Sequence, residues 1–370
     1  MNSCEILANL RTPAARRSLV SVVVPTYNRA PLLPAAISSV LSQSWMDVEV
    51  VIVDDGSTDG TREVVAGLAD ADERVRYIHQ PNGGVSSARN TALRHSRGAL
   101  IAFLDSDDAW HPGKLSAQVR ILEALPQVGM VWSDMHAVDR DGQLVCRNYL
   151  RKMYKGYQRL AGSRLFASSS RIGDLFDVDS GLAPDATVSW GRIYSDMLFG
   201  NLVHTSTVMI RRERAAAVGP FDETMRAGGE DYKFHLATTR LGEVAFLDAA
   251  TINYRIGADD QITNARNQVS FASAFLRTLE ENLSQHDSQT LSTNDVRRLR
   301  AGAHDWLASA YIEAGERRGA AAHALRALRQ RPSTPTAWKT LAKTILPRSA
   351  VGLVRAARRL GHRSTSAAVY

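Results

Sequence analysis

The sequence has few of the residues that would place it in an oxidising or membrane-spanning setting. Its 370 residues include only two cysteines, Cys4 and Cys146, which lie far apart and have no close cysteine or histidine partners. Neither a disulfide framework nor a zinc site is therefore indicated, and a reducing compartment fits best. No apolar run reaches the length of about 18 residues that a membrane span needs, and residues 1–17 lack the apolar core of a signal peptide. We expect a cytoplasmic protein, either soluble or peripheral to a membrane.

Acidic residues are scarce in the C-terminal part of the chain. Residues 296–370 hold fifteen Lys and Arg against three Asp and Glu, within a formal net charge of +7. Few aromatic residues are interleaved among these charges, which argues against nucleic-acid binding. Residues 351–363 place four apolar residues among four arginines. That pattern suits a helix lying on an anionic membrane surface, and it also suits an ordinary solvated helix.

Apolar, strand-like runs alternate with amphipathic stretches in the first half of the chain. We expect strands at residues 19–24, 48–53, 75–79 and 99–104, with helices at 32–41, 61–68 and 85–94 between them. This alternation predicts an α/β fold with a doubly wound, mostly parallel sheet and flanking helices.

The second half is less regular. Residues 151–200 show no sustained periodicity and are interpreted as an irregular insertion, whereas 203–211 predicts a strand and 244–247 and 251–255 predict two short ones. From residue 268 the composition becomes helical. Trp306 and Trp338 begin two similar stretches that are either partial tetratricopeptide-like repeats or terminal helices.

Three aspartates, Asp105, Asp107 and Asp108, follow the apolar run of residues 99–104. Like charges this close together are costly to bury unless a cation or hydrogen-bond donors meet them. Mg²⁺ and Mn²⁺ take oxygen ligands, commonly one or two carboxylates together with substrate phosphates. The cluster predicts a metal site for a phosphate-bearing substrate; the alternative is a solvated loop that caps the next helix.

Polar segments follow three of the predicted strands, at residues 25–29, 54–59 and 105–108. Because the carboxyl ends of parallel strands share one edge of a sheet, where such folds bind ligands, these segments should lie together. Gly83 and Gly84 lead into a helix whose free N–H groups would face the same edge. The acidic segment at 54–59 could instead be only a turn.

Four motifs resemble, in order and spacing, the nucleotide-binding half of family 2 glycosyltransferases. They are VVVPTYNR at residues 22–29, VDDGSTD at 53–59, GGVSSARN at 83–90 and LDSDD at 104–108. The resemblance extends to about residue 255 and implies a GT-A domain over 18–255. Residues 1–17 would be a flexible tail, and 256–370 a basic α-helical region outside the resemblance.

The resemblance also implies site residues. Tyr27 would stack on the nucleobase, Asp55 would accept a hydrogen bond from a uracil N–H, Arg89 would reach the base and phosphate region, and Asp105 would meet the ribose. The nucleotide-binding positions carried over are Pro25, Tyr27, Asn28, Arg29, Asp55, Arg89, Asp105 and Ser106.

Two further positions complete the implied chemistry. Asp107 would bind Mg²⁺ or Mn²⁺, with Asp108 as a helper, and Asp231 would be the catalytic base. Glu230 and Asp231 could instead serve only the dipole of the helix they begin. His204 stays unassigned.

The resemblance therefore implies a metal-dependent, inverting hexosyltransferase that uses a nucleotide sugar, expected to be a UDP-sugar. The acceptor would be a glycan or lipid-linked glycan in surface polysaccharide or glycolipid assembly, at the inner face of the membrane. The alternative is a catalytically inactive scaffold that binds nucleotide sugar and acts through its helical tail.

Overall fold

The protein, seen in a computed structural model, is described over residues 18–160, 165–177, 184–257, 267–285 and 291–345. It forms two compact units. The sheet unit holds the described residues up to Arg226 and again from Glu230 to Gly257, and the helical unit holds Ala227–Gly229 and the described residues from Asn267 onward. The predictions for residues 1–17 and 351–363 lie outside the described residues.

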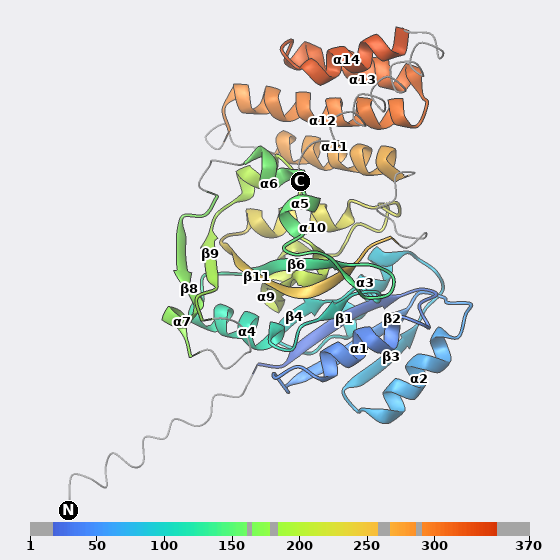
Figure 1. Cartoon of the computed structure of the whole chain (residues 1–370), viewed down its shortest axis with the longest axis vertical. Coiled ribbons are helices and arrows are strands. Elements are labelled where there is room, and N and C mark those ends of the chain that lie inside the picture. The colour runs from blue at the N-terminus through green and yellow to red at the C-terminus, as the bar shows by residue number, and fades with distance from the viewer. Residues whose placement is uncertain (1–17, 161–164, 178–183, 258–266, 286–290, 346–370) are drawn as a thin grey trace, which may run out of the picture. The chain divides into compact units, whose positions relative to one another are not determined.

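A single sheet runs through the sheet unit and is flanked by helices (Figure 1). Over the described residues its strands are β1 (Val20–Thr26), β2 (Val48–Asp54), β3 (Val75–His79), β4 (Leu100–Phe103), β5 (Ala109–Trp110), β6 (Met130–Val138), β7 (Leu144–Cys146), β8 (Ser168–Arg171), β9 (Thr187–Gly191), β10 (Met209–Arg211) and β11 (Val244–Arg255). The helices of this unit are α1 (Leu33–Leu41), α2 (Thr61–Ala71), α3 (Val85–His95), α4 (Lys114–Ala124), α5 (Leu150–Met153), α6 (Lys155–Arg159), α7 (Ile172–Leu175), α8 (Tyr194–Met197), α9 (Arg212–Val218) and α10 (Glu230–Arg240), with a 3₁₀ turn, η2 (Thr205–Thr207).

The strand order is β3-β2-β1-β4-β10-β6-β11-β9-β8, with β5 paired to β11 and β7 to β6. Strands β3, β2, β1 and β4 run parallel to one another, whereas β10 runs antiparallel to both β4 and β6. Every residue of β1, β2 and β4 is buried, as expected for central strands covered by helices on both faces. The predicted mostly parallel α/β sheet is confirmed.

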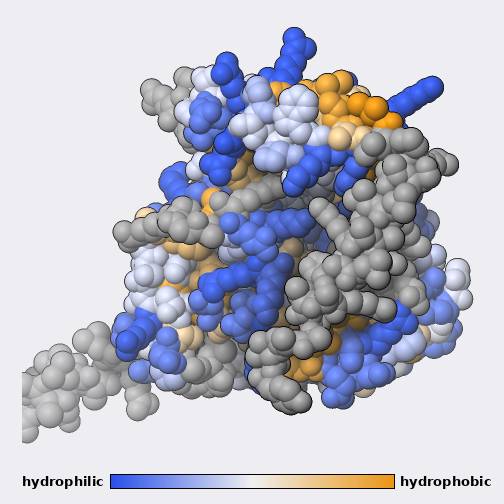
Figure 2. All heavy atoms as spheres, turned by 45° about the horizontal axis from the view of Figure 1, so that its top comes forward, coloured by the Kyte–Doolittle hydropathy of each residue, from blue (hydrophilic) through white to orange (hydrophobic). Residues whose placement is uncertain are grey.

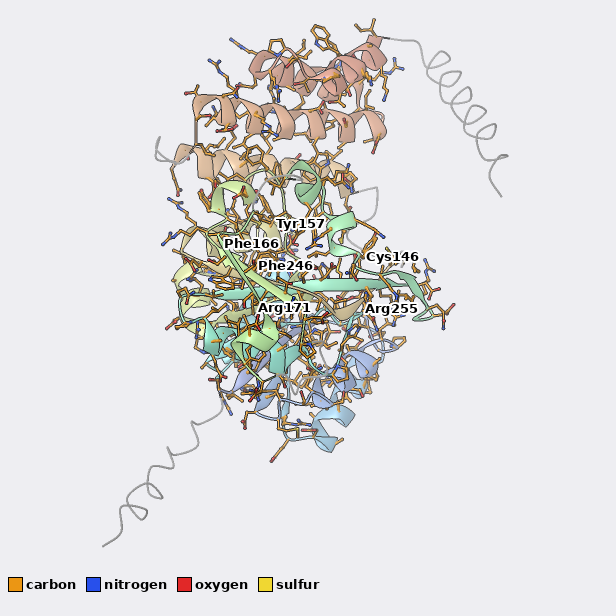
Figure 3. All side chains as sticks on the ribbon, turned by 60° about the vertical axis from the view of Figure 1, so that its left-hand side comes forward. Cys146, Tyr157, Phe166, Arg171, Phe246 and Arg255 are labelled. Atoms are coloured by element: carbon orange, nitrogen blue, oxygen red, sulfur yellow. The ribbon has the colours of Figure 1, made fainter. Side chains whose placement is uncertain are left out.

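Aromatic side chains pack against one another beside β6. The ring of Trp132 lies 5.9 Å from Phe166 and 5.6 Å from Phe246, and Tyr157 lies 6.2 Å from Phe246. Figure 3 labels three of these rings, Tyr157, Phe166 and Phe246, where they gather beside the sheet. This packing supports the segment that follows β7.

Two strand predictions in the second half are wrong in detail. Residues 203–211 form not one strand but η2 followed by the short β10, because the Thr207 hydroxyl donates to the His204 carbonyl and side-chain bonds of this kind compete with strand pairing. Residues 244–255 form one strand, β11, whose register against β6 shifts twice where two strands were expected.

The segment 151–200 is more ordered than predicted. Its described residues include β8 and β9, which pair antiparallel, and β9 in turn pairs with β11. These strands are short, β8 consists of polar residues only, and the half-buried positions of β9 mix polar residues with an aromatic one, so they carry little hydrophobic periodicity from which a strand could be predicted.

The helical unit contains α11 (Gln268–Ser284), α12 (Thr293–Glu313), α13 (Arg317–Gln330) and α14 (Pro335–Ile345). A capping box begins α12, where the Ser292 hydroxyl accepts from the Asp295 N–H and the Asp295 carboxylate accepts from the Ser292 N–H. Small residues, chiefly alanines of α12, α13 and α14, form its core. The interpretation of these helices as tetratricopeptide-like repeats stays a prediction.

Candidate functional site

The three polar segments leave the sheet at the carboxyl ends of β1, β2 and β4. Because these strands are parallel neighbours, the residues that follow them, Tyr27, Asp55 and Asp105, lie at the same edge of the sheet. The motifs separated in sequence are therefore adjacent in space, as the alternation of strands and helices predicts.

Asp55 anchors the glycine loop at this edge. Its Oδ1 accepts from the Gln80 amide at 2.7 Å and the Gly83 N–H at 2.8 Å, and its Oδ2 accepts from the Gly84 N–H at 2.7 Å. Gly84 has a φ of 90°, a conformation that other residues rarely adopt. A carboxylate has about four acceptor positions, so one position on Oδ2 stays open to a ligand.

The loop after β1 is held by its neighbour. The Asn28 N–H donates to the Ser57 hydroxyl at 2.9 Å, Asn28 Oδ1 accepts from the Thr58 N–H at 2.8 Å, and the Arg29 N–H donates to the Thr61 hydroxyl at 2.9 Å. Pro25 is buried within β1, whereas the Tyr27 side chain is 46% exposed. Of these predicted residues, Tyr27 presents a free aromatic surface, and Asn28 and Arg29 fasten the loop.

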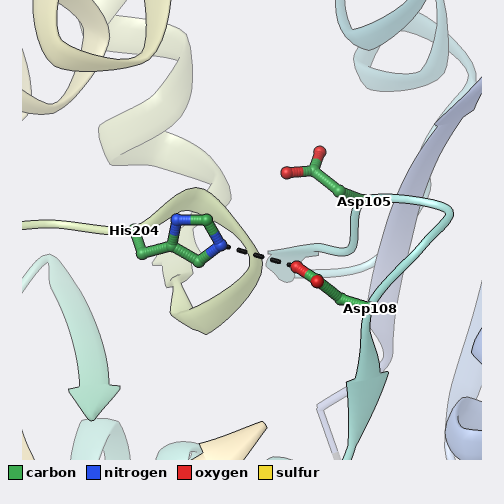
Figure 4. A group of neighbouring side chains, drawn as sticks. All are labelled: Asp105, Asp108 and His204. Atoms are coloured by element: carbon green, nitrogen blue, oxygen red, sulfur yellow. Dashed lines mark hydrogen bonds and ion pairs between the residues drawn. The ribbon is translucent and has the colours of Figure 1, made fainter. Parts of the chain in front are cut away.

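Asp105, Asp108 and His204 form a compact group of possible metal ligands (Figure 4). One ligand atom from each lies within 4.8 Å of the others. The His204 Nε2 is 3.4 Å from Asp108 Oδ2, and the Tyr154 hydroxyl lies 3.3 Å from His204 Nδ1. Two carboxylates and an imidazole suit a divalent transition metal such as Mn²⁺.

The Asp108 side chain and the Asp105 backbone are held by nearby groups. Asp108 is buried, its Oδ1 accepts the Arg255 N–H at 3.1 Å, and the Asp105 N–H donates to the Ser206 hydroxyl at 3.1 Å. Ser106, a predicted nucleotide-binding residue that lies between these two aspartates in the sequence, is buried. The resemblance implies only a helper role for Asp108, and this geometry adds Asp108 to the possible metal ligands.

Asp107, the predicted metal ligand, is outside the group of three in the part of the chain that the structure describes. Burial, reinforced by the Asp108 and Asp105 carboxylates, raises the pKa of Asp107 to about 7. A divalent cation beside these three carboxylates would reverse that effect and favour their ionised forms. The donor set and this charge crowding together fit a bound metal.

Arg89 joins the aspartate cluster to the start of α10. The residue is 4% exposed, and its two terminal nitrogens donate to Glu230 Oε1 at 2.9 Å and to Asp105 Oδ1 at 2.8 Å. Its role at the base and phosphate region stays a prediction. The pairing lowers the pKa of Asp105 against the opposing effect of burial.

Asp231 begins α10 beside this bridge. Burial raises its pKa, while the positive charges of Arg89 and His204 oppose the shift. The pKa of Glu230 is raised to about 7 by burial and by the neighbouring Asp231 carboxylate. A carboxylate with a raised pKa at a ligand-binding edge is suited to general base chemistry.

The sequence did not identify His204 or Tyr154 as members of this site. His204 precedes η2, and it reaches Asp108 because the Trp110 indole N–H donates to the Ser206 carbonyl at 3.0 Å and holds the turn in place. A histidine in an apolar segment carries no local signal of this role.

Comparison with known proteins finds related sequences over the part of the chain that carries these motifs. The sequence profile described as Glycosyl transferase family 2 matches residues 21–171. An uncharacterized glycosyltransferase of Nostoc is 41% identical over 121 residues, which is 32% of this chain and 36% of that protein. A putative teichuronic acid biosynthesis glycosyltransferase of Bacillus subtilis, TuaG, is 42% identical over 107 residues, 29% of this chain and 42% of that protein. The matched segments thus span well under two thirds of these curated relatives.

Two solved structures share the fold. The mannosyltransferase PcManGT of Pyrobaculum calidifontis, in complex with GDP-Man and Mn²⁺, superposes with a TM-score of 0.54 at 20% identity, over 92% of this chain and 81% of that chain. S. aureus TarS 1–349, in complex with UDP-GlcNAc, gives a TM-score of 0.50 at 16% identity, over 85% of this chain and 92% of that chain. These likenesses identify the GT-A fold.

Proposed function

We propose that the chain carries a family 2 glycosyltransferase domain, whose profile matches residues 21–171, and that this domain moves a sugar from a nucleoside diphosphate to an acceptor hydroxyl. The observation that carries the proposal is the meeting, at one edge of the sheet, of an exposed aromatic ring, a group of possible metal ligands and a carboxylate with a raised pKa. Each part matches one need of the reaction: binding the base, neutralising the diphosphate and activating the acceptor.

The donor is proposed to be a UDP-sugar. Tyr27 would stack on the base, and the open acceptor position of Asp55 Oδ2 would take the uracil N–H. TarS, which has the same fold, was solved with UDP-GlcNAc. PcManGT was solved with GDP-Man, so a guanine nucleotide is the comparison that the donor test must include.

Asp105, Asp108 and His204 would hold the metal, with Asp107 placed to add its charge. When bound, Mn²⁺ or Mg²⁺ neutralises the negative charge that grows on the departing diphosphate. The chain's own part is to position that charge: Arg89 fixes Asp105, and the Arg255 N–H fixes Asp108. The PcManGT complex contains Mn²⁺, which favours manganese here.

Asp231 is proposed as the general base. Its carboxylate takes the proton of the acceptor hydroxyl as the acceptor oxygen bonds to the anomeric carbon, and the bond from that carbon to the phosphate oxygen breaks to release the nucleoside diphosphate. A base on the face opposite the leaving group implies in-line displacement and inversion of the anomeric centre. General base catalysis of this kind contributes typically about 10²–10⁴-fold.

The acceptor is proposed to be a glycan or lipid-linked glycan in surface polysaccharide assembly, worked on at the inner face of the membrane. The name of TuaG, which includes teichuronic acid biosynthesis, supports the polysaccharide class. Among the described residues no helix is long and apolar enough to cross a membrane.

The test is donor turnover by the full-length chain. A panel of UDP-sugars and GDP-mannose is incubated with Mn²⁺, and the released nucleoside diphosphate is measured for wild type and for Asp231→Asn. We expect release with one donor, dependent on the metal and on Asp231. A wild type that binds UDP with Mn²⁺ but releases none, with acceptor extracts added, would instead support the inactive scaffold.

A further inference from the structure

The last two helices of the helical unit carry charge of only one sign. Residues 317–345 contain seven Lys and Arg and no Asp or Glu, and from residue 317 to the C-terminus the count is twelve against none. A solvated helical face normally mixes both signs. A run without any acid has nothing that would repel an anionic surface.

Helix α14 has two distinct faces. Ala337 is buried in the alanine core with Leu341 packed against it, and Thr340 is buried as well. The outer face carries Trp338, which is 55% exposed, and Ile345, which is 78% exposed. At 100° per residue these two lie on one side of the outer face, and Lys339 and Lys343, both exposed, lie on the other.

Helix α13 repeats this arrangement. Its inner face supplies Ala324, Ala327 and Leu328 to the same core, and its outer face exposes Leu325, 54% accessible, next to Arg329. Figure 2 shows hydrophobic and hydrophilic residues side by side over the helical unit at the top of the view. We use the name outer face for these exposed residues of the two helices, which are Leu325, Arg329, Trp338, Lys339, Lys343 and Ile345.

We propose that the outer face docks on an anionic lipid bilayer, with the basic residues against the headgroups and Trp338, Ile345 and Leu325 entering the interfacial layer. The charge is complementary to such a surface, and a large apolar side chain among cations is the pattern of interfacial helices. The Trp338 indole N–H already donates to the Pro332 carbonyl at 2.8 Å, so insertion of the ring leaves that donor satisfied. Exposed apolar side chains that are surrounded by charged ones commonly mark interaction sites on proteins.

An anionic nucleic acid would meet the same cations but would leave the aliphatic Leu325 and Ile345 without partners, because binding to single strands uses aromatic stacking along the strand. The apolar residues therefore favour a bilayer. The inference rests on the proposed function in one respect: docking would bring the enzyme to a lipid-linked acceptor.

The test is flotation of the full-length chain with two kinds of vesicle. One consists of neutral phosphatidylcholine alone, and the other also contains 30% of the anionic lipid phosphatidylglycerol. We expect binding only to the anionic vesicles. Lys339→Glu and Lys343→Glu should each weaken binding at least about fivefold, since one basic residue near such a surface contributes about that factor. Trp338→Ser should weaken it as well.

Matched controls lie in the sheet unit. Arg62→Glu makes the same charge change on the exposed face of α2, and Val145→Ser removes an apolar side chain that is 56% exposed. Both should bind as wild type does, and all five variants should keep wild-type release of nucleoside diphosphate in solution. Failure of the proposed function would abolish that release without altering flotation.

Two results would overturn the proposal. One is an effect of Lys339→Glu and Lys343→Glu no larger than that of Arg62→Glu. The other is binding that charge reversal abolishes but Trp338→Ser leaves intact, which would mean that the outer face adsorbs by charge alone and that its apolar residues do not enter the bilayer.

Discussion

Replacing Arg89 by methionine should destabilise the sheet unit strongly. Arg89 is shared by two carboxylates at the site, with ion pairs of 2.8 Å to Asp105 and 2.9 Å to Glu230. The Arg89 and Glu230 side chains are 5% and 6% exposed, so water cannot replace the lost partner at Glu230. Removing one member of a buried pair costs about 3–5 kcal/mol, and we expect Arg89→Met to lower the free energy of unfolding by that amount.

A second substitution isolates the cause. In Arg89→Met the buried Glu230 carboxylate has no cation, so adding Glu230→Gln should recover about 2 kcal/mol, because a neutral amide costs less to bury than an unpaired charge. Asp105, whose side chain is 28% exposed, can be hydrated and accounts for the remainder. The control is Arg151→Met, which breaks the 2.8 Å pair with Asp248 at side chains 48% and 36% exposed. Pairs of that kind are worth at most about 1 kcal/mol.

The assay is urea unfolding at pH 8, repeated at lower pH, of wild type, Arg89→Met, Arg89→Met with Glu230→Gln, Glu230→Gln and Arg151→Met. The folded pKa of Glu230, about 7, lies above its ordinary value of 4.5, so its contribution to stability is present below pH 4.5 and is lost as pH rises through 7. Glu230→Gln alone should flatten that part of the profile. The reasoning is refuted if Arg89→Met costs no more than Arg151→Met, or if Glu230→Gln recovers nothing in the Arg89→Met background.

Three other predictions follow from the site and the helical unit. Asp231→Asn should lower kcat by about 10²–10⁴-fold, because it removes the proposed general base. The affinity for UDP, measured by calorimetry with Mn²⁺, should stay within a factor of about two. A large loss of that affinity would argue against a role of Asp231 as the base. Asp55→Ala removes the acceptor of three N–H groups, so the free energy of unfolding should fall by about 1–3 kcal/mol. The affinity for UDP should fall more than about tenfold. Unchanged UDP binding would place the nucleobase away from Asp55. Burial lowers the pKa of His304 to about 4 and that of His323 below its ordinary value of 6.5. Both rings are then neutral in the folded helical unit, so its stability, followed by circular dichroism during unfolding, should decrease as pH falls from 6.5 toward 4. A stability that does not change over this pH range would contradict neutral rings.

The sheet could be predicted because its signals are local. Runs such as residues 48–53 combine β-branched residues with complete burial, and the polar segments after them must share an edge once the strands are parallel. The strands β8 and β9 could not be predicted in this way, since they are only four and five residues long and neither has a regular alternation of apolar and polar residues.

The site was predicted in its parts but not in its connections. Arg89 and Glu230 are 141 residues apart, and His204 and Asp108 are 96 apart. No spacing rule joins positions at such separations, and a buried arginine looks in sequence like a solvent-exposed one. The role implied for Arg89 by resemblance follows its place in a motif, whereas its partners depend on how α10 meets α3.

The direct test of sugar transfer at this edge is the binding of UDP to the full-length chain by calorimetry, with Mn²⁺ and then with the metal chelated. The site predicts binding with Mn²⁺ that weakens at least about tenfold on chelation, and equal weakening when both Asp105 and Asp108 are changed to Asn in the presence of Mn²⁺. UDP and GDP both failing to bind wild type with Mn²⁺, or binding equally well in the doubly substituted protein, would contradict the account.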